Sequence, residues 1–165
     1  MEQILVGMDI RHGAWEALAR ACALAERIEA HVHVLLVHPP PDAGIGGAET
    51  VWEAELRKRV EQCIQTAKAD GIAIDYFITE GSYEEEIIRF VRHYRITLLV
   101  YEITNRDLRS AQQGQWSLQA IRHRIACKVE IVAPRRTPQN TRQNTRKERH
   151  GFIPSPLSAH RGQQR

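Results

Sequence analysis

The first forty residues restrict the fold of this chain most strongly. Segment 4–9, Ile-Leu-Val-Gly-Met-Asp, is an apolar strand that ends on a carboxylate, an alanine-rich helical pattern covers 14–30, and a second apolar strand covers 31–38. A strand, a helix and a strand in this order predict a βαβ unit and therefore a parallel sheet. In such sheets ligands bind beyond the carboxyl ends of the strands, where the strand order reverses. The sequence thus places Asp9 where a ligand would bind.

The alternation continues to residue 133. Helical patterns at 49–69, after Ser82 and at 116–125 alternate with apolar strands at 72–79, 96–101 and 128–133. This order predicts an α/β fold, an open sheet of five parallel strands with helices on both faces. In the helix at 14–30 the apolar stripe includes Ile28. Gly71 after the helix at 49–69 predicts a left-handed cap, and Ser82 with Glu85 three residues on predicts a capping box at the start of the next helix. We expect one folded domain over residues 1–134.

The segment 135–165 lacks periodicity. It carries eight Lys and Arg side chains against one acid, whereas residues 1–134 carry 15 basic and 19 acidic side chains. Such a segment cannot bury enough apolar area to offset the entropy of ordering it, so we predict a disordered basic tail. Its charge leaves nucleic-acid binding open, but its one aromatic residue, Phe152, offers little base stacking. A solvated extension is the preferred interpretation.

Cysteine and histidine spacing indicates no structural metal or disulfide. Cys22, Cys63 and Cys127 lie far apart in apolar contexts, which favours reduced thiols. His31 and His33 share one face of a strand, yet the sequence shows no third ligand, so no metal site is expected. No apolar run approaches the roughly 20 residues that span a bilayer, and no leader segment is recognisable. We expect a cytoplasmic protein without membrane contact.

Several short motifs keep a common register across the domain. They are the strand that ends in Asp9, the Ala-Leu pattern at 17–25, the second strand ending near Pro39, Gly81 before a helix, and the closing strand 127–132. In this register the chain resembles the universal stress protein family. The resemblance implies the strand order 3-2-1-4-5, a homodimer and, in some members, bound ATP.

The ATP-binding members resemble one another through Gly-x-x-Gly, a spacer and Gly-Ser/Thr after the fourth strand, where backbone N–H groups close on phosphates. The corresponding stretch 101–109 contains no glycine, and Gly114 is followed by Gln115, with Ser117 two positions later. After its first aspartate the family continues Gly-Ser, whereas this chain has Ile10-Arg11. The phosphate cradle is therefore degraded.

Two functions remain open. The preferred one is a stress-response or regulatory protein that forms a homodimer and binds a protein partner. We expect it to be non-catalytic and without a cofactor, because no nucleophile elbow, Walker loop or dinucleotide fingerprint is present. The alternative is an adenine-nucleotide sensor that binds ATP or AMP through a divergent loop. Its site residues would be Asp9, Ile10, Val37, Glu102, Arg106, Gly114 and Ser117.

Plainer interpretations of these residues stay open too. Asp9 is equally consistent with a strand-end residue that caps nearby N–H groups. Gly114 and Ser117 also fit a turn followed by a helix cap, and Glu102 adds a negative charge where a triphosphate would lie. Arg106 could offset that charge, since guanidinium groups pair well with phosphate.

The last strand carries the dimer prediction. By the implied order it lies at a sheet edge, where unpaired backbone groups must be covered or paired. Its proline-free sequence keeps every donor available, and a two-fold axis would pair the strand with its own copy. The expected interface residues are Val129, Ile131 and Val132.

Overall fold

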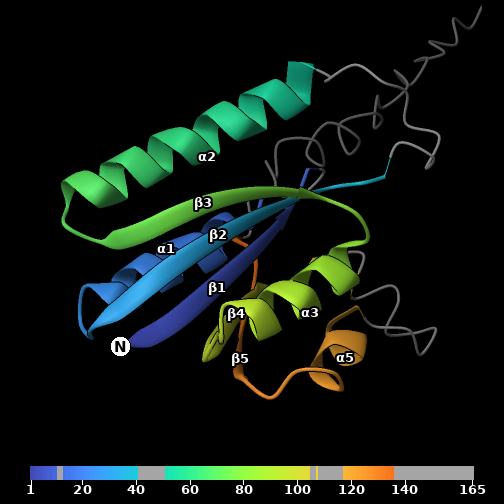
Figure 1. The fold of residues 1–165 in the computed structure, drawn as a ribbon. Helices are drawn as coiled ribbons and strands as arrows, with labels where there is room; N and C mark the ends of the chain where they lie inside the picture. The colour runs from blue at the N-terminus through green and yellow to red at the C-terminus, as the bar shows by residue number, and fades with distance from the viewer. Residues whose placement is uncertain (11–12, 41–50, 105–106, 108–116, 136–165) are drawn as a thin grey trace, which may run out of the picture. The chain divides into compact units, whose positions relative to one another are not determined.

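The computed structural model describes residues 1–10, 13–40, 51–104, 107 and 117–135. Its elements are β1 (Glu2–Asp9), α1 (Trp15–Ala25), β2 (Ala30–His38), α2 (Val51–Ala69), β3 (Ala73–Glu80), α3 (Tyr83–His93), β4 (Leu98–Glu102), α5 (Ser117–Arg122) and β5 (Lys128–Val132). Every pairing is parallel, and the strand order is β3-β2-β1-β4-β5 (Figure 1). The predicted α/β class and strand order are confirmed. The predicted tail lies outside the described residues apart from Arg135.

Helices cover both faces of the sheet, as predicted. α1 and α2 pack on one face over residues such as Val6 and Val34, while α3 and α5 pack on the other over Leu5, Leu35 and Leu99 (Figure 1). Alternate residues of each central strand therefore enter opposite clusters. Because both faces of β1 and β2 are buried, the sequences of these strands are nearly continuous apolar runs.

The ends of two helices show where the sequence pattern was right and where it was wrong. Gly71 adopts φ +85° after α2, and the N–H of Ile72 reaches the carbonyl of Ala67 at 3.0 Å, which is the predicted left-handed cap. α1 instead ends at Ala25, before the predicted stripe is complete, because the chain turns there toward β2. Ile28 is consequently 44% exposed rather than buried.

The three cysteines are free thiols, as expected. All three are half-buried, and burial raises the pKa of the Cys22 and Cys127 thiols, so both stay protonated at neutral pH. No helix in the described ranges is long and apolar enough to cross a membrane. The cytoplasmic location stays a prediction.

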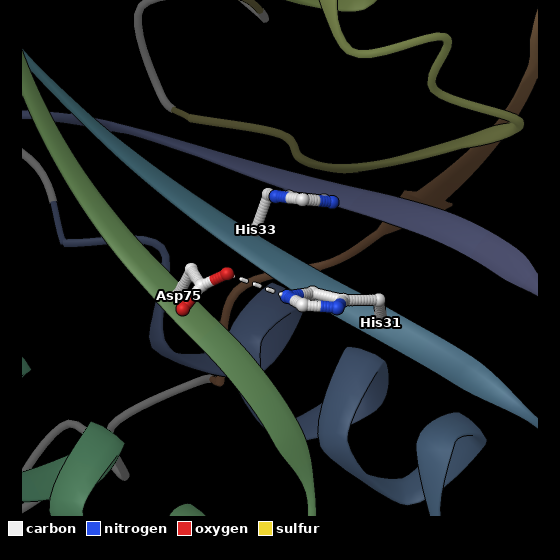
Figure 2. A group of neighbouring side chains, drawn as sticks. All are labelled: His31, His33 and Asp75. Carbon is white, nitrogen blue, oxygen red and sulfur yellow. Dashed lines mark hydrogen bonds and ion pairs between the residues drawn. The ribbon is translucent and has the colours of Figure 1, made fainter.

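The histidine pair has a third neighbour that the sequence did not reveal. His31 and His33 lie on one face of β2, and Asp75 of β3 is the register partner of His33 (Figure 2). Because β2 and β3 are parallel neighbours, residues far apart in the chain meet across one hydrogen-bonded ladder. The sequence therefore did not reveal the third potential ligand, and the expectation that no metal binds here stays a prediction.

Candidate functional site

A cavity of about 550 Å³ opens at the carboxyl ends of the central strands. Asp9 ends β1, Val37 lies near the end of β2, and Tyr101 and Glu102 end β4; all four line the cavity. β1 lies between β2 and β4, so the cavity occupies the point where the strand order reverses. This is the place that the βαβ pattern predicted.

The candidate nucleotide residues divide into three groups. Asp9, Val37, Glu102 and Ser117 line the cavity. Ile10 does not: it is 4% exposed and packs in the hydrophobic cluster beneath α1 and α2, because its apolar side chain continues the inward-facing row of β1. Arg106 and Gly114 lie outside the described residues, so their roles stay predictions.

Glu102 caps the start of α1 across the sheet. Its Oε2 accepts hydrogen bonds from the backbone N–H groups of Glu16 at 3.0 Å and Ala17 at 3.1 Å. Ala14, at the N-cap position, has no side-chain acceptor for these donors. The first N–H groups of a helix form a natural anion site. In this chain a protein carboxylate already occupies them.

Glu102 should make stability depend on pH. Burial raises the pKa of Glu102, against the opposing effect of the hydrogen bonds from Ala17 and Glu16. A carboxyl with a raised folded-state pKa stabilises the fold below its unfolded pKa and loses that contribution as pH rises through the folded pKa. We therefore expect the free energy of unfolding of Glu102→Gln to rise relative to that of the wild type as the pH increases above the ordinary glutamate pKa of about 4.

Urea unfolding at a series of pH values measures this difference. Glu55→Gln, a change at an exposed glutamate of α2, controls for the loss of one surface charge. The free energy of unfolding of Glu102→Gln minus that of the wild type should rise with pH. A difference that stays constant or falls as pH rises would contradict the raised pKa of Glu102.

A second polar group lies just after β4. Asp107 is 4% exposed and accepts hydrogen bonds from the Tyr101 hydroxyl at 2.9 Å and from the Thr104 N–H at 2.9 Å. The Thr104 hydroxyl oxygen in turn accepts from the Asp107 N–H at 3.2 Å, which is the reciprocal pattern of a capping box. Thr-x-x-Asp is visible in the sequence as a capping signal. The site residues predicted in this stretch were chosen for phosphate chemistry, however, so Tyr101, Thr104 and Asp107 were not among them.

Tyr83 forms another part of the wall that the sequence analysis missed. Its hydroxyl lies 3.4 Å from the carbonyl oxygen of Gly7, a long hydrogen bond. Burial raises the pKa of both Tyr83 and Tyr101, and nearby Asp107 acts in the same direction on each. Both hydroxyls therefore keep their protons at neutral pH. Each donates one hydrogen bond, Tyr83 to the Gly7 carbonyl and Tyr101 to Asp107.

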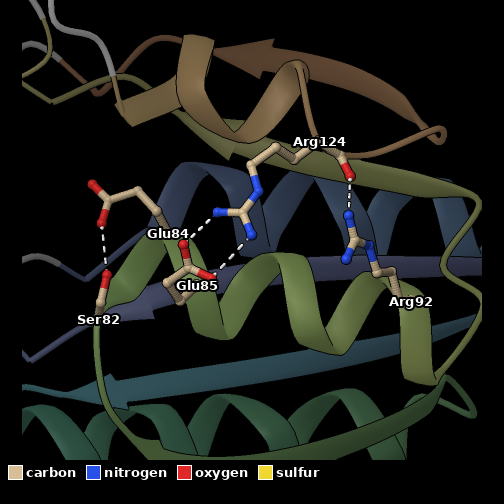
Figure 3. A network of polar contacts seen from close by, with 5 residues as sticks. All are labelled: Ser82, Glu84, Glu85, Arg92 and Arg124. Carbon is tan, nitrogen blue, oxygen red and sulfur yellow. Dashed lines mark hydrogen bonds and ion pairs between the residues drawn. The ribbon is translucent and has the colours of Figure 1, made fainter.

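Glu84 connects α3 with α5 at the cavity rim. One of its carboxylate oxygens accepts from the Ser117 hydroxyl at 2.5 Å. The other accepts from the Ser82 hydroxyl at 3.2 Å (Figure 3). Ser82 was expected to form a capping box with Glu85, but it makes no side-chain cap bond. Glu85 instead pairs with Arg124 next to α5, so tertiary contacts take both partners away from the cap.

The described cavity wall is acidic. It contains the carboxylates of Asp9, Glu84, Glu102 and Asp107, and no Lys, Arg or His among the lining residues that the structure describes. Tyrosine and serine hydroxyls supply the remaining polar groups. The described part of the wall offers hydrogen bonds to a neutral or weakly charged ligand, and its carboxylates disfavour a polyphosphate placed beside them.

β5 lies at the edge of the sheet, as the strand order requires. Val129 and Val132 are half-buried and pack against the clusters on opposite faces, whereas Ile131 is 40% exposed. On the α1 side Glu130 pairs with Arg20 at 2.5 Å. Val129 and Val132 therefore lie on opposite faces of the sheet, and the role of Val129, Ile131 and Val132 in a dimer stays a prediction.

Comparisons with known proteins identify relatives of this fold. The sequence model of the universal stress protein family matches residues 1–132. A crystal structure of a universal stress protein in complex with cAMP is 17% identical with a TM-score of 0.61, covering 80% of this chain and 96% of that one. A family protein from Burkholderia pseudomallei is 19% identical, with a TM-score of 0.59 and coverage of 79% and 95%.

A third similar structure is the universal stress protein from Archaeoglobus fulgidus in complex with dAMP. It is 17% identical with a TM-score of 0.55, and the match covers 79% of this chain and 97% of that one. The search of curated proteins finds no match. At these identities the structures establish the fold, and the family match rests on residues 1–132.

Proposed function

Since this chain belongs to the universal stress protein family, we propose that it is a non-catalytic regulatory module whose cavity binds an adenine nucleoside or a nucleotide with little phosphate charge. The single observation that carries the proposal is the cavity at the strand-order reversal, lined by Asp9, Val37 and Glu102. Ligand occupancy would then control the binding of a protein partner. A location in the cytoplasm is part of this proposal.

Size and position support a nucleoside-sized ligand. Small-molecule sites enclose roughly 300–1,000 Å³ and combine apolar walls with a few polar groups. The cavity of about 550 Å³ combines Val37, Pro39 and Pro40 with the hydroxyl of Tyr83 and the carboxylate of Asp9. An adenine ring would lie against the apolar residues, and Asp9 could accept hydrogen bonds from ribose hydroxyls.

Charge supports a ligand with few phosphates. Glu102 occupies the helix donors that could hold an anion, and Glu84 and Asp107 add negative charge nearby. A triphosphate would lie among like charges, each of which disfavours its binding. Two similar structures were solved with cAMP and with dAMP, ligands that carry one phosphate each. These complexes support the nucleotide class and not ATP in particular.

Thermal-shift and calorimetric titrations with adenosine, cAMP, AMP and ATP test the proposal. A ligand at about 100 times its Kd stabilises the folded chain by roughly 2.7 kcal/mol. We expect adenosine and cAMP to raise the Tm and ATP to do so least. Asp9→Asn should weaken adenosine binding about tenfold, and Asp70→Asn, the same change at an exposed residue after α2, should leave it unchanged.

The order of affinities separates the alternatives. ATP binding most tightly would show that arginines of the 102–115 loop neutralise the wall, and would overturn the low-charge proposal. The absence of a shift with any of these ligands at millimolar concentration would reject ligand sensing altogether, leaving a module that works through protein partners alone.

A further inference from the structure

A cluster of potential metal ligands lies on the sheet away from the cavity. His31 and His33 come from the start of β2 and Asp75 from β3, whereas the cavity lies at the carboxyl ends of the strands. One ligand atom from each of the three side chains lies within 4.8 Å of the other two (Figure 2). The cluster plays no part in the proposed nucleoside site.

The contacts of His33 leave one nitrogen available. Its Nε2 lies 2.8 Å from Oε1 of Gln3, and since an amide oxygen only accepts, Nε2 carries the proton. Nδ1 then holds a lone pair, and it is buried without a hydrogen-bond partner in a side chain that is 5% exposed. A neutral imidazole whose other N–H is held by an oxygen is the form found in metal sites.

His31 and Asp75 complete the donor set. His31 stacks on His33 with ring centroids 4.6 Å apart, and its Nε2 lies 2.7 Å from Oδ2 of Asp75. The side chains of His31 and Asp75 are 28% and 51% exposed, so an ion can reach them from solvent. An ordinary ion pair between His31 and Asp75 does not explain this arrangement, because it leaves the buried Nδ1 of His33 without a hydrogen-bond partner.

From this geometry we propose that His31, His33 and Asp75 bind a divalent transition-metal ion of the zinc class. Two imidazoles and a carboxylate suit Zn²⁺, with water as the fourth ligand. Neighbouring ligand atoms in a tetrahedral zinc site lie about 3.3 Å apart. Nε2 of His31 and Oδ2 of Asp75, now 2.7 Å apart, must therefore separate slightly around the ion, and the three ligand atoms, which now lie within 4.8 Å of one another, must shift to reach it. The ion would replace the His31–Asp75 hydrogen bond and join β2 to the edge strand β3.

Titration of the full-length protein with Zn²⁺ by calorimetry, and with Co²⁺ by visible absorption, tests the site. We expect one high-affinity equivalent, a rise in Tm with Zn²⁺, and Co²⁺ bands typical of tetrahedral nitrogen and oxygen ligands. His31→Gln and Asp75→Asn should each weaken binding at least tenfold, and both sites are exposed enough for the variants to fold.

His93→Gln is the matched control. His93 is an exposed histidine at the end of α3 that belongs to no part of the cluster, so this variant should bind like the wild type. Equal binding by the wild type and the His31→Gln/Asp75→Asn double variant would overturn the proposal and assign any zinc to other histidines. Adenosine affinity is measured in parallel, since loss of the metal site leaves the nucleoside proposal standing.

Discussion

Replacing Gly7 with alanine is expected to lower the free energy of unfolding by about 1–3 kcal/mol, because α3 packs directly against the backbone of β1. A Cβ at Gly7 would lie 2.3 Å from Cδ1 of Ile87 and 2.9 Å from the Tyr83 hydroxyl. Ile87 is 0% exposed, so its side chain has no open space to enter. Urea unfolding of the variant measures the loss. Displacement of Tyr83 should weaken adenosine binding as well.

A double-mutant cycle isolates the clash. Ile87→Val removes the nearest atom and alone costs about 0.5–1.5 kcal/mol. In the Gly7→Ala background its cost should disappear or reverse, which gives a coupling energy of about 1 kcal/mol or more. Gly71→Ala is the control: that glycine has open space around it, so only backbone strain at φ +85° is added. Strict additivity of Gly7→Ala and Ile87→Val would show that the close approach is unimportant.

Ile131→Pro is expected to convert a homodimer of about twice 18.9 kDa into a monomer. The N–H of Lys128 bonds to Thr97 at 3.1 Å, and the carbonyl of Val132 accepts from Ile103 at 2.9 Å. The backbone N–H and C=O groups of the even-numbered residues of β5 thus point toward β4. The N–H of Ile131, an odd-numbered residue, points to the open side of the strand. Proline at this position removes an edge donor and spares the β4 ladder. Light scattering measures the mass.

Ile131→Thr is the matched control, because threonine keeps both the β-branch and the N–H donor. It should remain dimeric if backbone pairing of β5 forms the interface. A wild-type mass near 18.9 kDa would reject the dimer. A proline variant that stays dimeric would place the interface elsewhere, with the opposite edge strand β3 the next element to test.

Local patterns predicted the framework well. The apolar runs of β1 and β2 and the alanine-rich α1 follow from backbone and burial rules that act within about twenty residues. The left-handed helix cap at Gly71 could be predicted from the residue type alone, because glycine has no Cβ to disfavour a positive φ. Asp9 could be placed at the ligand end of the sheet from the βαβ rule alone. The strand order came from the family resemblance.

The site itself depended on contacts between distant residues. Tertiary structure decided that Glu102 caps α1, that Glu84 joins Ser82 to Ser117, and that Ile10 enters the core. No periodicity in one segment encodes the partner of a side chain in another.

The same reason explains Asp75. On its own strand it is one exposed acid among others, and only the register of β3 on β2 brings it to His31 and His33. The sequence by itself determined which segments are strands and helices and predicted the edge of the sheet where the cavity lies, because those properties are local. The chemistry of the cavity and the cluster was decided by the parallel sheet, which sets residues dozens of positions apart within hydrogen-bond distance.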